Sequence, residues 1–112
     1  MTTSKTFILE KELTWQPAGT GVTRQILSYN DNLMIVKVKF EKGAIGAPHT
    51  HPHSQCTYVD SGVFEFFVED ERQIVSRGDG IYIAPDKNHG VTCIEAGILI
   101  DSFSPARQDF LV

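Results

Sequence analysis

The stretch from Gly43 to Gly62 reads GAIGAPHTHPHSQCTYVDSG and contains three of the four histidines in the chain. Alternate side chains of an extended strand point to one face, so His49 and His51 would lie about 6.6 Å apart on the same side. Two imidazoles at this spacing can reach one metal ion through bonds of about 2.0–2.1 Å. The segment therefore predicts a metal site built on β-strands.

Gln55 would lie about 20 Å from His49 if this strand continued straight, which is too far for a shared ion. Pro52 cannot donate a ladder hydrogen bond and favours a strand edge or a bend. We therefore expect the chain to turn here, so that Gln55 returns on a neighbouring strand. The fourth histidine, His89, lies in a second loop marked by glycine and proline. The expected metal ligands are His49, His51, Gln55 and His89.

A single histidine is more often a satisfied core or surface residue than a metal ligand. We apply this interpretation to His53, which is expected to orient a neighbour or to be exposed. It does not suit His49 and His51, because two imidazoles on one face of a strand broken by proline have no ordinary packing purpose.

Length and composition limit the class of protein. The 112 residues predict one domain, 1–112, with a single core. The short apolar run near the start is no signal sequence, and no stretch approaches the roughly 18 apolar residues of a membrane span. Cys56 and Cys93 suit a reducing cytoplasm, although two thiols also allow one disulfide. The net charge of −4, without a basic stripe, argues against nucleic acid as a partner.

Apolar and polar residues alternate with a period of two over most of the chain, as in LMIVKVKF at 33–40. Similar runs occur at 22–28, 63–69, 73–76, 81–83, 91–94 and 98–103. Turn-forming residues separate them at 60–62, 69–72, 77–80, 84–88 and 95–97. Short strands at regular spacing, without an amphipathic helix, predict an all-β sandwich or barrel. Positive φ in tight turns is expected at Gly43, Gly62, Gly78 and Gly80.

The histidine-rich segment resembles the first motif of the cupin superfamily, G(x)5HxH(x)3-4E(x)6G. The match runs from Gly43 through His49, His51 and Gln55 to Gly62, and glutamine replaces the usual glutamate. This resemblance implies an all-β cupin fold, a double-stranded β-helix or small jelly-roll barrel. It also implies one divalent metal ion bound by the matched residues, and a homodimer.

A second segment, GDGIYIAPDKNH, is similar to the second cupin motif, G(x)5PxGxxH. The distance from Gly78 to His89 is that of the motif, whereas Pro85 lies one place late and Asp86 stands where the motif has glycine.

A narrower resemblance, to the KdgF family of pectin-degradation proteins, covers nearly the whole chain. It rests on HTHPHSQCTYVDSGVFEF, with glutamine as the third ligand, and on the ending DSFSPARQDFL. Members of that family are small cupins that open the ring of 4,5-unsaturated monouronates, the final products of pectate and alginate lyases. The resemblance implies the metal ligands His49, His51, Gln55 and His89 and the catalytic residues Asp101, Phe103 and Arg107.

The tail residues also have a chemical rationale. Asp101 and Phe103 share one face of a strand, so Asp101 can enter the barrel as a general acid and base. Arg107 can clamp a carboxylate with its guanidinium fork, and Phe103 can pack against a sugar ring. The alternative is a surface ion pair for Asp101, a core position for Phe103 and a solvated cation for Arg107. Arg24 and Tyr82 are lesser candidates for lining the pocket.

Three imidazoles and one amide are neutral, so a bound ion keeps its full charge and acts as a Lewis acid. Nickel, zinc, iron, manganese and copper all suit these ligands. We expect a cytoplasmic metal-dependent cupin that linearises unsaturated sugar acids. The alternatives are a cupin dioxygenase, another metal isomerase and a non-catalytic sugar-binding cupin. In the expected homodimer, Trp15 and Pro17 would anchor the N-terminal segment, 1–20, against the second subunit.

Overall fold

The computed structural model describes residues 2–112 and contains one antiparallel sheet and two short 3₁₀ helices. The strands are β1 (Gln16–Pro17), β2 (Val22–Asn30), β3 (Leu33–Phe40), β4 (Ile45–His49), β5 (Ser54–Val68), β6 (Glu71–Ser76), β7 (Gly80–Ile83) and β8 (His89–Ser104). The 3₁₀ helices are Glu10–Glu12 and Gln108–Leu111. Within residues 2–112, no helix has the length and apolar character to cross a membrane. The predicted all-β class is confirmed.

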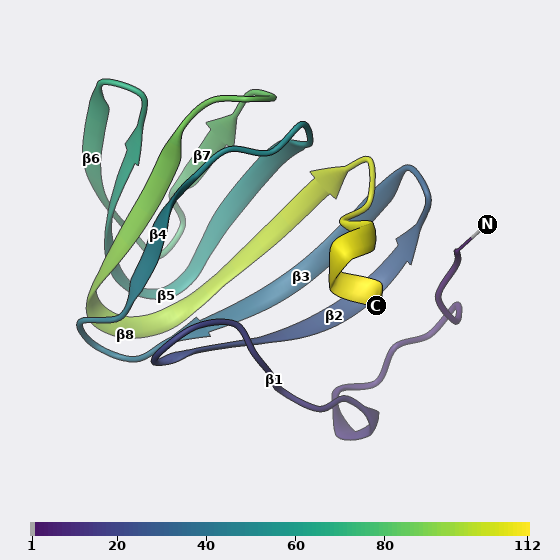
Figure 1. The fold of residues 1–112 in the computed structure, drawn as a ribbon. Coiled ribbons are helices and arrows are strands. Elements are labelled where there is room, and N and C mark those ends of the chain that lie inside the picture. The colour runs from purple at the N-terminus through teal and green to yellow at the C-terminus, as the bar shows by residue number, and fades with distance from the viewer. Residues whose placement is uncertain (1) are drawn as a thin grey trace.

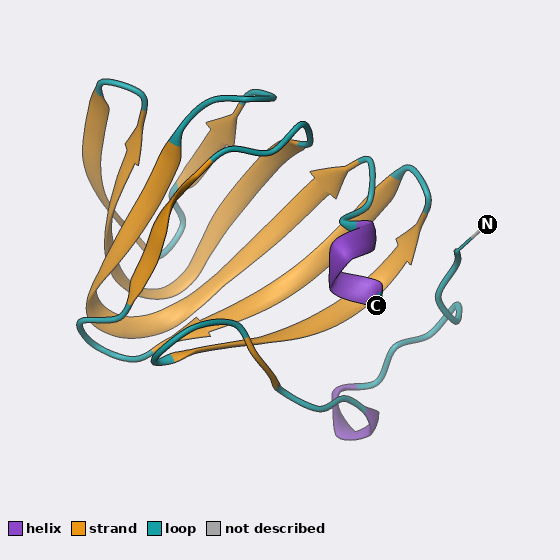
Figure 2. Ribbon diagram, in the orientation of Figure 1, coloured by secondary structure: helices purple, strands orange, loops and turns teal. Residues whose placement is uncertain are grey.

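Strands β5 and β8 run side by side through the middle of a strongly curved sheet (Figure 1). The sheet order is β1-β2-β3-β8-β5-β6, while β4 pairs with the first part of β8 and β7 with the first part of β5. The 3₁₀ helix after β8 lies beside β3 and β2 (Figure 2), where Phe110 packs against the cluster around Met34 and Phe103. This curvature gives the sheet a concave interior on which side chains from distant strands converge.

The alternation predicted for 33–40 is confirmed in β3. Met34, Val36 and Phe40 are buried, whereas Lys37 and Lys39 point to the other face of the sheet. Because β3 pairs with β8 in regular antiparallel register, its inward residues lie opposite the inward residues of β8. The β8 positions that carry the candidate site are thereby set against the core.

The separators predicted at 60–62 and 95–97 are wrong, because these residues continue the long strands β5 and β8. The strands bend there through shifts of register between Val59 and Phe64. A Cβ on Gly97 would lie 2.1 Å from the carbonyl oxygen of Ser61, and one on Gly62 would lie 2.6 Å from that of Glu95. The glycines therefore serve a close backbone approach inside the paired strands and do not divide them.

Positive φ in a turn is confirmed at Gly43 and Gly78, with values of 83° and 93°. Gly62 also has a positive φ, 85°, but it lies within β5 and not in a tight turn. The expectation for Gly80 is wrong, because this residue begins β7 and has no positive φ. The predicted loop at 84–88 is confirmed between β7 and β8.

The N-terminal segment lies against its own sheet. Strand β1 pairs with β2, and Glu10 forms an ion pair with Lys37 of β3. The indole ring of Trp15 lies 4.4 Å from the amino nitrogen of Lys39. Trp15 therefore packs on its own chain, and its expected contact with a second subunit stays a prediction. Both cysteines are free thiols.

Replacing Gly97 by alanine should lower the free energy of unfolding by about 1–3 kcal/mol, because the new methyl group collides with the backbone of β5. Urea denaturation of the metal-free protein measures this change. Gly80→Ala is the matched control, since its Cβ would meet only one atom, at 3.6 Å. The control should change stability by less than about 0.5 kcal/mol. Equal stability of the two variants would contradict the close approach.

Candidate metal centre and adjoining cavity

The structure brings the four predicted metal ligands together. His49 ends β4 and lies opposite His89, the first residue of β8, while His51 follows in the loop that bends at Pro52. The ring centroids are 4.3 Å apart for His49 and His89, and 4.8 Å for His51 and His89. Gln55 returns on β5, with its Oε1 2.9 Å from Nε2 of His51. The predicted turn between the two parts of the motif is thus confirmed.

Backbone carbonyls determine which nitrogen of each ring can bind a metal. Nδ1 of each ring lies near the carbonyl oxygen of a residue two places away: Ala47 at 2.9 Å for His49, Lys87 at 2.9 Å for His89 and His53 at 3.1 Å for His51. A carbonyl oxygen only accepts, so Nδ1 carries the hydrogen and donates it. Nε2 of all three rings is left with its lone pair, the form in which neutral imidazole binds a metal.

The contact between His51 and Gln55 fits a bound cation. The amide nitrogen of Gln55 donates to Thr57, which directs its Oε1 at Nε2 of His51. Because Nδ1 of His51 holds the hydrogen, two lone pairs face each other at 2.9 Å. Burial lowers the pKa of His51, which opposes a second proton on this ring. A metal ion accepts both lone pairs.

The donor atoms of the three histidines all lie within 4.8 Å of one another. Ligand atoms bound to one ion at about 2.1 Å lie at most about 4.2 Å apart, so small ring rotations bring them onto an ion. Burial also lowers the pKa of His89. His51 and His89 are 6% and 4% exposed, and both are therefore held in the neutral, metal-binding form.

His53 does not join this cluster. Its backbone carbonyl accepts the hydrogen bond from His51, and its ring packs against the rings of His51 and Phe103 at 5.4 and 6.3 Å. This arrangement agrees with the expectation that His53 orients a neighbour. Its buried Nδ1 has no partner among residues 2–112.

A chain of hydrogen bonds joins the candidate metal centre to Asp101. The Gln55 amide donates to the hydroxyl of Thr57 at 3.0 Å, and this hydroxyl donates to Oδ1 of Asp101 at 2.6 Å. Sequence reasoning missed Thr57, although it lies two residues after Gln55 on the same face of β5. The register pairs Thr57 with Asp101 across β5 and β8.

Burial raises the pKa of Asp101 to about 6, while hydrogen bonds from Thr57 and Gln55 and the charge of Arg107 act in the opposite direction. Asp101 is partly buried and lines a cavity of about 370 Å³. A carboxyl group with a pKa near neutrality can both accept and release a proton at physiological pH.

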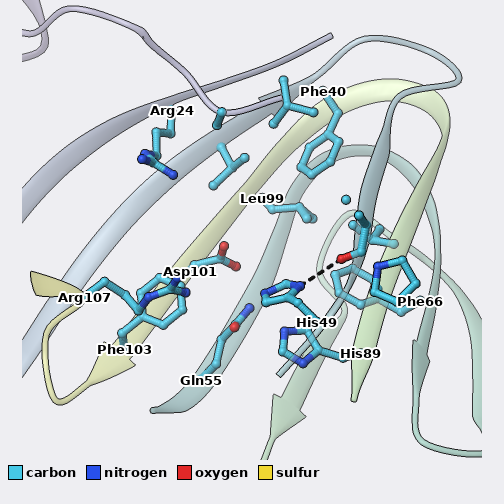
Figure 3. A pocket seen from close by; sticks show the side chains of 18 of the residues that line it. Arg24, Phe40, His49, Gln55, Phe66, His89, Leu99, Asp101, Phe103 and Arg107 are labelled. Atoms are coloured by element: carbon cyan, nitrogen blue, oxygen red, sulfur yellow. Dashed lines mark hydrogen bonds between the residues drawn. The ribbon is translucent and has the colours of Figure 1, made fainter. Parts of the chain in front are cut away.

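Asp101 lies between two groups of side chains in this cavity (Figure 3). The guanidinium groups of Arg24 and Arg107 lie on one side, and the imidazoles of His49 and His89 on the other. Arg24 therefore lines the pocket as expected. Asp101 is the one acidic residue among the described residues that line it, beside two arginines.

Phe103 and Arg107 line the cavity but make strong contacts within the protein. Phe103 is 3% exposed, and its ring packs against His51 and Phe110 at 5.8 Å each. Arg107 forms a two-pronged ion pair with Asp109, with distances of 3.0 and 2.9 Å. Arg107 is thus not the solvated cation of the alternative interpretation.

Two further outcomes concern aromatic residues. Tyr82 is 64% exposed and is not among the residues that line this cavity, so that expectation is wrong. Tyr82 lies between Ile81 and Ile83 on β7, so its side chain points to the opposite face of the strand, away from the core. Phe110 lines the cavity and was missed, although it belongs to the quoted DSFSPARQDFL ending.

His89→Ala should weaken metal binding by at least about 100-fold, because it removes a buried ligand. The metal retained after incubation with one equivalent of zinc or nickel and gel filtration measures this loss. His53→Ala is the control and should retain the metal, since its backbone carbonyl still orients His51. Loss of metal in His53→Ala together with retention in His89→Ala would show that the ligand set is wrongly assigned.

Asp101→Asn should stabilise the metal-free protein above pH 6. The raised pKa means that the folded state holds the proton more tightly than the unfolded state, so stability is lost as pH rises from 3.8 through about 6. This loss is at most about 3 kcal/mol, and the neutral amide avoids it. Urea denaturation at several pH values should show a gap between variant and wild type that closes below pH 4. A gap that is independent of pH would contradict the raised pKa.

Comparisons with known proteins agree with this geometry. Residues 36–100 match the family described as Cupin domain. The pectin degradation protein KdgF of Dickeya dadantii (strain 3937) is 44% identical over 107 residues, which cover 94% of this chain and 97% of that protein. An RmlC-like cupin from Shewanella frigidimarina NCIMB 400 superposes with a TM-score of 0.95 at 42% identity, covering 98% of this chain and 99% of that one. For KdgF from Halomonas sp., the TM-score is 0.90 at 38% identity, with 96% and 99% covered.

Proposed function

The chain belongs to the cupin family and is a relative of the KdgF proteins, and on this premise we propose that it linearises 4,5-unsaturated monouronates from pectin or alginate breakdown. The observation that carries the proposal is the cavity in which two imidazoles of the three-histidine cluster, one carboxyl group and two guanidinium groups meet. Its volume of about 370 Å³ lies within the range of small-molecule sites. Arg24 lines it and forms no salt bridge with any of residues 2–112, which suits an acidic sugar.

Ring opening of such a substrate is an isomerisation and needs no oxidant. The hydroxyl at C1 loses its proton, the bond between C1 and the ring oxygen breaks, and C1 becomes an aldehyde. The electron pair passes through the ring oxygen and C5 to C4, which takes up a proton and leaves a ketone at C5. One proton has moved from oxygen to carbon, so a single acid and base can serve both steps.

Asp101 is suited to this transfer. Thr57 donates to Oδ1, which orients the carboxyl group and leaves Oδ2 for the substrate. With a pKa of about 6, Asp101 is mostly ionised at neutral pH, so it can take the proton from the C1 hydroxyl and return it to C4. Phe103 and Arg107 close the wall of the cavity beside it.

His49, His51, Gln55 and His89 would hold one divalent ion, and nickel, zinc, iron, manganese and copper all suit these donors. When bound, the ion would supply Lewis-acid stabilisation of negative charge on a substrate oxygen. The neutral ligand set leaves its charge undiminished. Gln55 has a second role, because its amide nitrogen holds the Thr57 hydroxyl that orients Asp101.

The test follows the loss of ultraviolet absorbance when metal-loaded protein meets lyase-generated unsaturated monouronate. The absorbance should fall much faster than in the spontaneous reaction. Asp101→Asn should slow turnover by about 10²–10⁴-fold without changing the metal content, because it removes the proton carrier. Asp70→Asn, at the exposed turn after β5, is the control and should keep full activity.

The other outcomes separate the rival functions. Decay no faster than the spontaneous reaction would refute the isomerase. Oxygen consumption would indicate a dioxygenase, and tight sugar binding without turnover would indicate a binding protein. Loss of metal in Asp101→Asn would assign Asp101 to the structure of the centre and not to proton transfer.

A further inference from the structure

The two guanidinium groups of the cavity differ in their partners. One edge of the Arg107 guanidinium group is engaged by Asp109, to which Nε donates at 3.0 Å and a terminal nitrogen at 2.9 Å. By contrast, no salt bridge joins Arg24 to any of residues 2–112, and its Nε is buried without a hydrogen-bond partner. The positive charge of Arg107 is therefore largely neutralised, whereas that of Arg24 is not.

A buried donor without a partner is unfavourable, so the position of Arg24 needs an explanation. Burial and the charge of Arg107 lower the pKa of Arg24, but arginine stays protonated in proteins. The free protein thus holds, at the wall of a cavity that can admit a ligand, a cation that forms no salt bridge with any of residues 2–112. An anion in the cavity would supply the counter-charge through the terminal nitrogens of Arg24.

Phe110 holds Arg24 in place without using its hydrogen-bond donors. The central carbon of the Arg24 guanidinium lies 3.7 Å from the centre of the Phe110 ring, and that of Arg107 lies 4.3 Å from it. Stacking occupies the flat face of a guanidinium group and leaves its N–H edge free. That edge can form the bidentate pair with a carboxylate that arginine favours.

The register of the sheet directs Arg24 to the concave face that carries Asp101. Arg24 on β2 pairs with Val38 on β3, which pairs with Leu99 on β8, two residues before Asp101. Residues two apart on a strand share a face, so Arg24 and Asp101 belong to adjacent rows of that face. Figure 3 shows the Arg24 guanidinium on the side of Asp101 away from His89.

We propose that Arg24 binds the carboxylate of the substrate and determines the preference of the site for sugar acids over neutral sugars. This inference rests on the proposed function and refines it. With the carboxylate at Arg24, the sugar ring lies over Asp101 and extends toward the imidazoles. Arg107, engaged by Asp109, then positions Phe110 without clamping the substrate.

The test compares Arg24→Gln and Arg24→Lys in the metal-loaded protein, with the unsaturated monouronate and its uncharged methyl ester as substrates. Arg24→Gln should raise KM for the acid about 10–100-fold, because a charged hydrogen-bonded pair is lost, and should leave KM for the ester nearly unchanged. Arg24→Lys keeps the charge without the fork and should lie between. Metal content should stay that of the wild type in both variants.

Arg72→Gln is a matched control, because Arg72 is exposed and stacks on Phe67 at 5.2 Å outside the cavity. It should leave both KM values unchanged. The inference is overturned if Arg24→Gln keeps the preference for the acid, or if it weakens acid and ester equally. The Lys variant keeps the test valid if the Gln variant does not fold.

Calorimetric titration separates this inference from the proposed function. Wild-type protein should bind galacturonate more tightly than galactose, and Arg24→Gln should remove the difference. This result supports Arg24 as the carboxylate-binding residue even if the wild type fails to turn over the unsaturated substrate. An equal preference for galacturonate in wild type and variant overturns the inference even if turnover is observed.

Discussion

Three backbone carbonyl oxygens control the candidate metal centre, because each accepts the N–H of one histidine ring. Those of Ala47, Lys87 and His53 engage Nδ1 and leave Nε2 as the donor to a metal. These carbonyls are positioned by the end of β4, the start of β8 and the loop after Pro52. The pairing of β4 with β8 thus places His49 opposite His89, while the loop after Pro52 supplies the carbonyl that orients His51.

From this centre, the side chains change across the cavity from neutral imidazoles to a carboxyl group and then to guanidinium groups. Gln55 contacts His51 and donates to the Thr57 hydroxyl, which in turn donates to Asp101. Beyond Asp101 stand two cations, Arg107, which pairs with Asp109, and Arg24, which forms no salt bridge with any of residues 2–112. A ligand with a carboxylate at one end and hydroxyl groups at the other complements this order, which is why an acidic sugar suits the cavity.

Much of this arrangement could be predicted from the sequence, because period-two alternation and proline have direct geometric meaning. The HxH spacing, the turn at Pro52 and the inward face of β3 depend on local rules. The long strands could not be predicted, because glycine marks both turns and close backbone approaches, and Gly97 serves the second. Nor does sequence distinguish an engaged arginine from an unengaged one. Asp109 is near Arg107 in the chain, whereas the isolation of Arg24 appears only in three dimensions.

A crystal structure of the metal-loaded protein, with anomalous diffraction measured at the absorption edge of the ion, tests the account most directly. We expect one peak within about 2.0–2.3 Å of Nε2 of the three histidines and of Oε1 of Gln55. All three hydrogen bonds from Nδ1 to backbone carbonyls should be retained, and the Gln55 amide nitrogen should still face Thr57. An ion bound through Nδ1, or one that leaves Gln55 uncoordinated, would contradict it.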